Sequence, residues 1–144
     1  NAEAAMIIAI RCCEYIDVLN PMEVYSLIAL ASYTSKFYEI CSLSLTKLRT
    51  LKNIDQTSSA SIQNLAFAIF TKQKPVNSND LSLCYKECIE SGQKYHACTI
   101  SGKSIAHKRA LQCRFCRYYM LEEEARGRKS CALCHGDIRH AEMV

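Results

Sequence analysis

Two C-x2-C motifs near the C-terminal end of this chain constrain its fold more than any other feature. They are Cys113-Arg-Phe-Cys116 and Cys131-Ala-Leu-Cys134, with 14 residues between them. Two residues between cysteines allow a tight turn that aims both sulfur atoms at one cation, and the intervening segment returns the second pair to complete a tetrahedron. The spacing therefore predicts one structural zinc ion with Zn–S bonds of about 2.3 Å.

We call the two motifs knuckle 1 (residues 113–116) and knuckle 2 (residues 131–134). Phe115 and Leu133 are expected to give them apolar cover. Free or disulfide-linked dithiols are the alternative to zinc, and two knuckles at this distance argue against them. Because four thiolates leave no open coordination position, hydrolytic zinc chemistry is not expected, and no Cys-His-acid set is evident for nucleophilic catalysis.

Six further cysteines lie outside the knuckles, at positions 12, 13, 41, 84, 88 and 98. The first three fall in apolar helical patterns, where a free thiol behaves as a small hydrophobe. A reducing compartment fits this usage better than a disulfide scaffold does. The spacing of Cys84, Cys88, His96 and Cys98 also permits a second zinc site, although packed thiols are the simpler interpretation, and the sequence leaves that choice open.

The polar stretch from Pro75 to Asp80 divides the chain. We expect a helical part in residues 1–74, a linker in 75–94 and a zinc-binding ribbon in 95–144. The chain enters an apolar helical pattern directly after Asn1, so we interpret it as a C-terminal fragment of a larger protein. The densest apolar run, Met6 to Ile10, is too short to cross a bilayer and has no signal-peptide pattern.

Four helices are expected in the first part. The first carries an apolar face from Met6 to Val18, and the second starts at Pro21 and ends near Thr34. The third runs from about Phe37 to Asn53, and the fourth from about Ser61 to Lys72, with its apolar set buried against the third. Two antiparallel helix pairs of this kind are the units of an α-solenoid. A small four-helix bundle is the alternative.

The second part shows β patterns. Residues 95–106 predict a hairpin that leads into knuckle 1. Strands at 117–121 and 127–130 are expected to flank the acidic run Glu122 to Glu124 and to join the knuckles as a zinc ribbon. Residues 80–94 suit either a helix or a strand. The predicted fold class is therefore mainly α, the end of an α-solenoid followed by a small β zinc-ribbon module.

Several segments resemble the WD-repeat subunits of intraflagellar transport complex A, which also carry tetratricopeptide-like repeats. The segments are Glu14 to Leu30, Lys47-Leu48, Leu65 to Lys72, and Cys98-Thr-Ile-Ser-Gly-Lys103 with both knuckles. The resemblance covers nearly the whole chain in order. It implies Cys113, Cys116, Cys131 and Cys134 as metal ligands and nothing catalytic. The sequence departs from the family pattern at Leu111, Arg117-Tyr118 and Ala132, which puts the partner surface around the knuckles in doubt but removes no ligand.

The resemblance implies a non-enzymatic scaffold in retrograde ciliary transport and in the ciliary entry of membrane proteins. Its partners would be other subunits of the complex, with no small-molecule substrate and only indirect contact with membrane. Its location would be the cilium or flagellum, the ciliary base and the cytoplasm. Two alternatives remain. A basic zinc ribbon can bind nucleic acid, although a net charge of +4 is low for that role, and a RING-like ubiquitin ligase would need eight ligands in a cross-braced order, which this chain lacks.

Overall fold

The computed structural model describes residues 1–75 and 82–144, so all but Pro75 of the expected dividing stretch lies outside the described residues. The described chain forms two compact units, Asn1–Lys94 and Tyr95–Val144, which we call the helical unit and the zinc unit. In the described ranges, no helix has both the length and the apolar character needed to span a bilayer.

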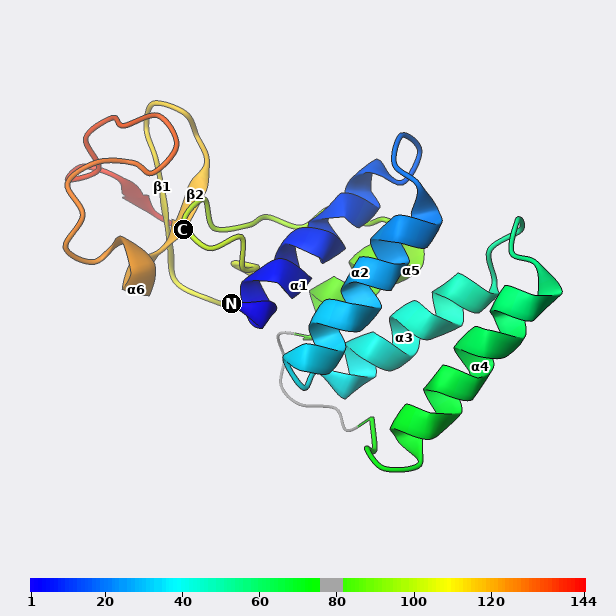
Figure 1. Ribbon diagram of the computed structural model, residues 1–144. Coiled ribbons are helices and arrows are strands. Elements are labelled where there is room, and N and C mark those ends of the chain that lie inside the picture. The colour runs from blue at the N-terminus through cyan, green and yellow to red at the C-terminus, as the bar shows by residue number, and fades with distance from the viewer. Residues whose placement is uncertain (76–81) are drawn as a thin grey trace. The chain divides into compact units, whose positions relative to one another are not determined.

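The helical unit is an array in which successive helices pack side by side (Figure 1). Its elements are α1 (Ala2–Arg11), the 3-10 helix η1 (Cys12–Tyr15), α2 (Pro21–Thr34), α3 (Tyr38–Arg49), α4 (Gln56–Phe70) and α5 (Ser82–Ser91). Helix α1 packs on α2, α2 on α3, and α3 on α4, whereas α1 and α4 do not contact each other. The helices therefore form an open array of the solenoid type and not a closed four-helix bundle.

Short polar side chains fix where α2 and α4 begin. The Asn20 side chain accepts a hydrogen bond from the backbone N–H of Met22 at 3.1 Å, and Pro21 occupies the first turn of α2. Asp55 accepts from the N–H of Ser58 at 3.0 Å and caps α4 in the same way. Each cap satisfies a backbone donor that has no partner within the helix, which stabilises the helix by about 1 kcal/mol in typical cases.

Large aliphatic side chains from successive helices form the core. Ile10 and Ile28 have no exposed surface, and Met6 and Ile40 are 1% exposed. Each contributes about 1.5–3 kcal/mol through removal of apolar surface from water.

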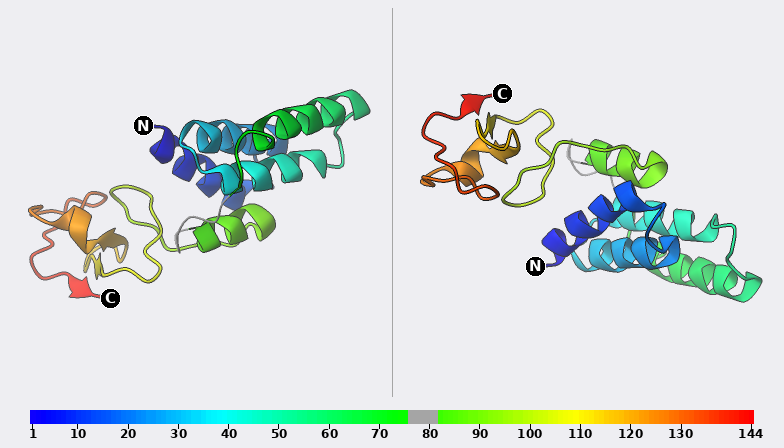
Figure 2. Two further views of the ribbon diagram at one scale, coloured as in Figure 1. Left: turned by 90° about the horizontal axis from the view of Figure 1, so that it is seen from below. Right: turned by 90° about the horizontal axis from the view of Figure 1, so that it is seen from above.

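Helix α5 packs on α1 and α3 with Ile89 1% exposed. Figure 2 shows α5 and α4 on opposite sides of the helical unit. The described part of the expected linker at 75–94 thus contains a packed helix.

The predicted apolar face of the first helix is only partly correct. Helix α1 ends at Arg11 and the chain tightens into η1, so Tyr15 and Val18 are 54% and 83% exposed. The side chain of Leu27 in α2, predicted to lie in the core stripe, is 56% exposed. The change from an α-helical to a 3-10 period after Arg11 accounts for Tyr15 and Val18, which it rotates away from the core face, but not for Leu27, which lies in a regular α-helix.

Helix α4 differs most from the prediction. It begins at Gln56, five residues before Ser61, because Asp55 provides the cap. None of its residues is fully buried, and Leu65 is 53% exposed. The prediction that its apolar residues are buried against the third helix is therefore only partly correct: α4 packs on α3, and Ile62, Ala66, Ile69 and Phe70 are half-buried.

The zinc unit contains a small antiparallel sheet with strand order β2-β1-β3. The strands are β1 (Ala110–Gln112), β2 (Tyr119–Leu121) and β3 (Glu142–Met143), and helix α6 (Glu122–Ala125) follows β2 directly. Leu111 of β1 faces Met120 on one side and Met143 on the other. Strand β3 close to the chain terminus was not predicted.

Two predicted β features are reduced in the structure. The hairpin at 95–106 is represented by one isolated bridge between Ala97 and Ser104. The expected strand at 127–130 is absent from this described segment, where Ser130 forms a single bridge to Asp137. The predicted fold class is nevertheless confirmed: a mainly α chain with an array of helix pairs, followed by a small β module with a cysteine cluster.

Candidate metal centre

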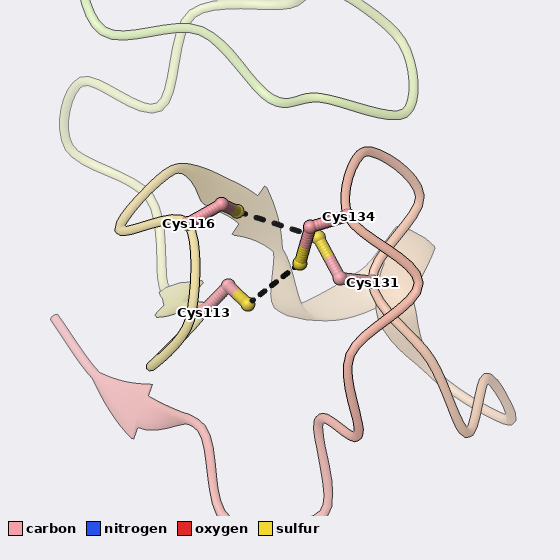
Figure 3. A group of neighbouring side chains, drawn as sticks. All are labelled: Cys113, Cys116, Cys131 and Cys134. Carbon is pink, nitrogen blue, oxygen red and sulfur yellow. Dashed lines mark hydrogen bonds between the residues drawn. The ribbon is translucent and has the colours of Figure 1, made fainter.

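The four knuckle cysteines converge on one point. Their sulfur atoms all lie within 4.8 Å of one another, and they point toward a common centre from two facing loops (Figure 3). The Sγ atoms of Cys113 and Cys134 are 3.6 Å apart, and those of Cys116 and Cys131 are 3.7 Å apart. A tetrahedral zinc ion with Zn–S bonds of about 2.3 Å requires sulfur separations of about 3.8 Å. The donor set therefore fits zinc in both chemistry and spacing.

Knuckle 1 connects β1 to β2 through two backbone hydrogen bonds. The N–H of Arg117 donates to the carbonyl oxygen of Cys113 at 2.9 Å, and the N–H of Cys113 donates to that of Tyr118 at 2.9 Å. Arg117 has a φ of 63°, in the left-handed region. The turn thus reverses the chain while both cysteine side chains stay on its inner side.

Knuckle 2 repeats this pattern. The N–H of His135 donates to the carbonyl oxygen of Cys131 at 3.1 Å, and the N–H of Cys131 donates to that of Gly136 at 2.8 Å. His135, like Arg117, is left-handed, with a φ of 60°. The two halves of the site therefore have the same backbone design.

Backbone donors also act on the sulfur atoms. The N–H of Leu133 lies 3.4 Å from Cys131 Sγ. At Cys113, burial opposes ionisation, but hydrogen bonds from the backbone of Cys116 and Phe115 and from neighbouring thiols lower the pKa to about 7. Burial raises the pKa of Cys116 to about 12, and the adjoining cysteines contribute to the increase. A divalent cation bound at this point would supply the positive charge that ionises coordinating thiols.

The tips of the knuckles are more exposed than expected. Phe115 is 70% exposed and Leu133 is 53% exposed, so the prediction that they cover the site is wrong. The ring of Phe115 instead lies against Gly136, where an added Cβ would be 2.5 Å from Phe115 Cδ2. This contact joins knuckle 1 to the residue that follows knuckle 2. The sequence offered no signal for it beyond the glycine itself.

Cys98 occupies a packed position. Its sulfur lies 3.2 Å from the N–H of Leu121 and 3.4 Å from that of Ile100, and 3.0 Å from a carboxylate oxygen of Glu124. The side chain is 2% exposed. Cys98 therefore links the segment before β1 to the end of β2 and to α6.

The residues of the alternative second zinc site are otherwise engaged. Cys88 Sγ lies 3.4 Å from the carbonyl oxygen of Ile10, and the His96 ring packs edge-on against Tyr119. Burial raises the pKa of the Cys88 thiol to about 11. Within residues 1–75 and 82–144, the knuckle cysteines form the one group of three or more His, Cys, Asp or Glu side chains that lie close enough together to bind one metal ion.

Comparison with known proteins agrees with the two-unit organisation. The family described as "IFT121-like, TPR repeats" matches residues 1–77, and the one described as "IFT121, second zinc finger domain" matches residues 96–139. WD repeat-containing protein 35 from Rattus norvegicus is 28% identical to this chain over 137 residues, and so are the proteins of the same name from Mus musculus and Homo sapiens.

The alignments with these relatives cover 94% of this chain but only 12% of the rat protein and 11% of the mouse and human proteins. The chain thus spans about an eighth of the length of the relatives that it matches. The repeat family alone covers more than half of this chain and agrees with its array of helix pairs. The chain therefore belongs to the IFT121-like family, with TPR-type helix pairs and a zinc finger domain.

Proposed function

We propose that this chain is part of a non-enzymatic scaffold subunit of intraflagellar transport complex A and that one structural zinc ion stabilises its zinc unit. The ligands would be Cys113, Cys116, Cys131 and Cys134. The observation that carries the proposal is the convergence of these four sulfur atoms at separations suited to tetrahedral zinc. With every coordination position filled by a thiolate, the ion would stabilise structure and would not activate water.

The small core of the zinc unit supports a structural role for the metal. The strands have three, three and two residues, and cysteines make up much of the buried cluster. A unit of this size has too little apolar surface to fold stably without a further source of free energy. Zinc binding at such a site supplies about 10–16 kcal/mol of apparent folding free energy.

Family membership supports the scaffold role. The proposed activity is retrograde ciliary transport and the ciliary entry of membrane proteins, carried out through contacts with other subunits. The proposed location is the cilium or flagellum, the ciliary base and the cytoplasm. No small-molecule substrate is proposed, and contact with membrane would be indirect.

The charge distribution bears on the nucleic-acid alternative. The zinc unit has nine Lys or Arg and five Asp or Glu, so it carries the whole net charge of +4, while the helical unit is neutral. Several cations are paired, including Arg109 with Glu122 at 3.1 Å and Arg114 with Glu142 at 3.4 Å. Four thiolates around Zn²⁺ would add a net charge of about −2. The net positive charge that remains on the zinc unit is small for a phosphate-binding surface.

Metal content gives the direct test. Protein purified without added metal should contain one zinc per chain by inductively coupled plasma mass spectrometry. Cys113→Ser should lower this content, whereas Cys12→Ser, a half-buried cysteine outside the cluster, should not. A folded wild-type protein without zinc would refute the metal assignment.

A second test addresses assembly. Charge reversal at Arg126, Arg128 and Lys129, which are exposed, should weaken co-purification with other subunits without changing zinc content. Unchanged co-purification would exclude this surface as a subunit contact. If the wild-type protein itself fails to co-purify with the complex, the scaffold proposal is wrong. A salt titration with duplex and single-stranded oligonucleotides should show no steep loss of affinity, and a slope of several units would favour the nucleic-acid alternative.

A further inference from the structure

The helical unit has an apolar groove that its own side chains leave open. It lies between α2, α3 and α4 and has a volume of about 630 Å³. Leu45 and Leu48 of α3 line it together with Leu30 and Tyr33 of α2 and Leu65 of α4. In α2 and α4 the lining residues recur at helical spacing, so each helix presents a stripe along one side of the groove.

The exposure of these stripes indicates a binding surface. Leu30 is 64% exposed and Leu65 is 53% exposed, although both lie in helices whose apolar stripes would normally be buried. None of the residues of α4 is fully buried, and a helix of this length is marginal in water without tertiary packing. A contiguous exposed apolar surface of this kind is typical of sites where another protein binds. A bound helix could pack its apolar side chains against the stripes on α2 and α4 and against α3 between them.

The charges around the groove indicate which helix would fit. Among the residues that the structure describes, Lys72 is the one charged residue that lines the groove. The adjoining hollow of about 390 Å³ shares Met22 with the groove and is lined by Lys52. Helices α2, α3 and α4 are successively antiparallel (Figure 1). Lys72, which follows α4, therefore lies at the end of the groove near Tyr33, and Lys52, which follows α3, lies beyond the opposite end near Met22. No acidic side chain of the described residues lines either hollow. A positive charge thus stands at each end of an apolar surface.

From these observations we infer that the groove binds an acidic amphipathic helix of another polypeptide, with acidic residues at both ends of its apolar stripe. The groove stripe on α2, from Met22 to Tyr33, has a length of about 16 Å at 1.5 Å per residue. The bound helix would therefore have about three turns, with apolar residues at i, i+4, i+7 and i+11. This inference rests on the proposed scaffold function, since it specifies the kind of partner that the scaffold would hold.

Site-specific photo-crosslinking in the native complex tests the inference. The photoreactive residue p-benzoylphenylalanine would replace Leu65 in the full-length protein expressed in ciliated cells. The matched control position is Phe67, which is 75% exposed on the same helix but does not line the groove. Mass spectrometry of crosslinked peptides should find, at position 65 and not at 67, an acidic amphipathic segment of a different polypeptide. Crosslinks to a second copy or to a remote segment of the same polypeptide would refute the inference, as would no crosslink above the control.

A binding measurement with a synthetic peptide of the crosslinked segment completes the test. Leu30→Glu should weaken the affinity of the full-length protein for this peptide at least tenfold, and Lys72→Glu several-fold. Phe67→Glu should leave it unchanged. Equal affinity of wild type and Leu30→Glu would refute the groove as the site. Zinc content and co-purification of the wild-type complex, measured in the same preparations, report on the proposed function separately: intact co-purification with a negative groove result refutes only this inference.

Discussion

The core of the helical unit consists of large aliphatic side chains such as Ile10, Ile28 and Ile40. The core of the zinc unit is rich in cysteines. Of the seven residues in the buried cluster of the zinc unit, Cys98, Cys113 and Cys131 are cysteines, and only Met120, Leu121 and Ile138 are large apolar residues. One unit therefore derives its stability from apolar surface distributed over several helices, and the other would depend on the proposed zinc ion for much of its stability. The two units should therefore respond to different perturbations.

Loss of a zinc ligand should have the largest effect. Cys113→Ser or Cys134→Ser should unfold the zinc unit, since about 10–16 kcal/mol of apparent folding free energy depends on the complete ligand set. Hydrogen exchange should show loss of protection in β1 and β2 while α1, α2 and α3 stay protected. Loss of helical signal in circular dichroism would mean that the two units depend on each other, which would break the comparison.

A cavity in the helical core should produce the complementary result. Ile10→Ala removes a side chain with no exposed surface and should lower the free energy of unfolding of the helical unit by about 2–5 kcal/mol. Urea denaturation followed by circular dichroism measures this change. Zinc content should stay at the wild-type value, and a parallel loss of zinc would again contradict independent units.

A smaller effect is expected where the two knuckles touch. Gly136→Ala places a Cβ 2.5 Å from Phe115 Cδ2, so the exposed ring must shift, and the zinc unit should lose about 1–2 kcal/mol of stability. The double variant with Phe115→Ala removes the clash and should recover most of that loss. Thermal unfolding of the zinc-loaded variants measures both. If the double variant is no more stable than Gly136→Ala, the contact is not the cause.

The smallest effect concerns backbone strain in knuckle 2. His135 has a φ of 60°, a conformation that costs a non-glycine residue about 1 kcal/mol and that glycine adopts freely. His135→Gly should therefore raise the stability of the zinc unit by at most about 0.5 kcal/mol, after allowance for the larger entropy of glycine in the unfolded chain. Ala132→Gly is the control, since its φ is not positive, and it should lower stability instead. Equal changes in both variants would show that strain at His135 contributes nothing.

The predictions from sequence held where local chemistry decides. Asn20 and Pro21 are adjacent signals for a helix start, and α2 begins at Pro21 as predicted. The C-x2-C spacing predicted two turns with converging sulfur atoms, and the structure has them. Predictions failed where a residue's environment depends on distant segments. Leu27 and Leu65 have the right period for a core stripe, but their side chains are 56% and 53% exposed.

The start of α2 and the position of the cysteine cluster could be read from the sequence alone, because hydrogen bonds and turns within a few residues produce both. Only the tertiary structure decided that α4 packs along one flank beside an open groove, that η1 turns Tyr15 and Val18 outward, and that β3 pairs with β1. The physical reason is that burial and strand pairing depend on segments far apart in the chain, whereas caps and knuckles are complete within a single turn.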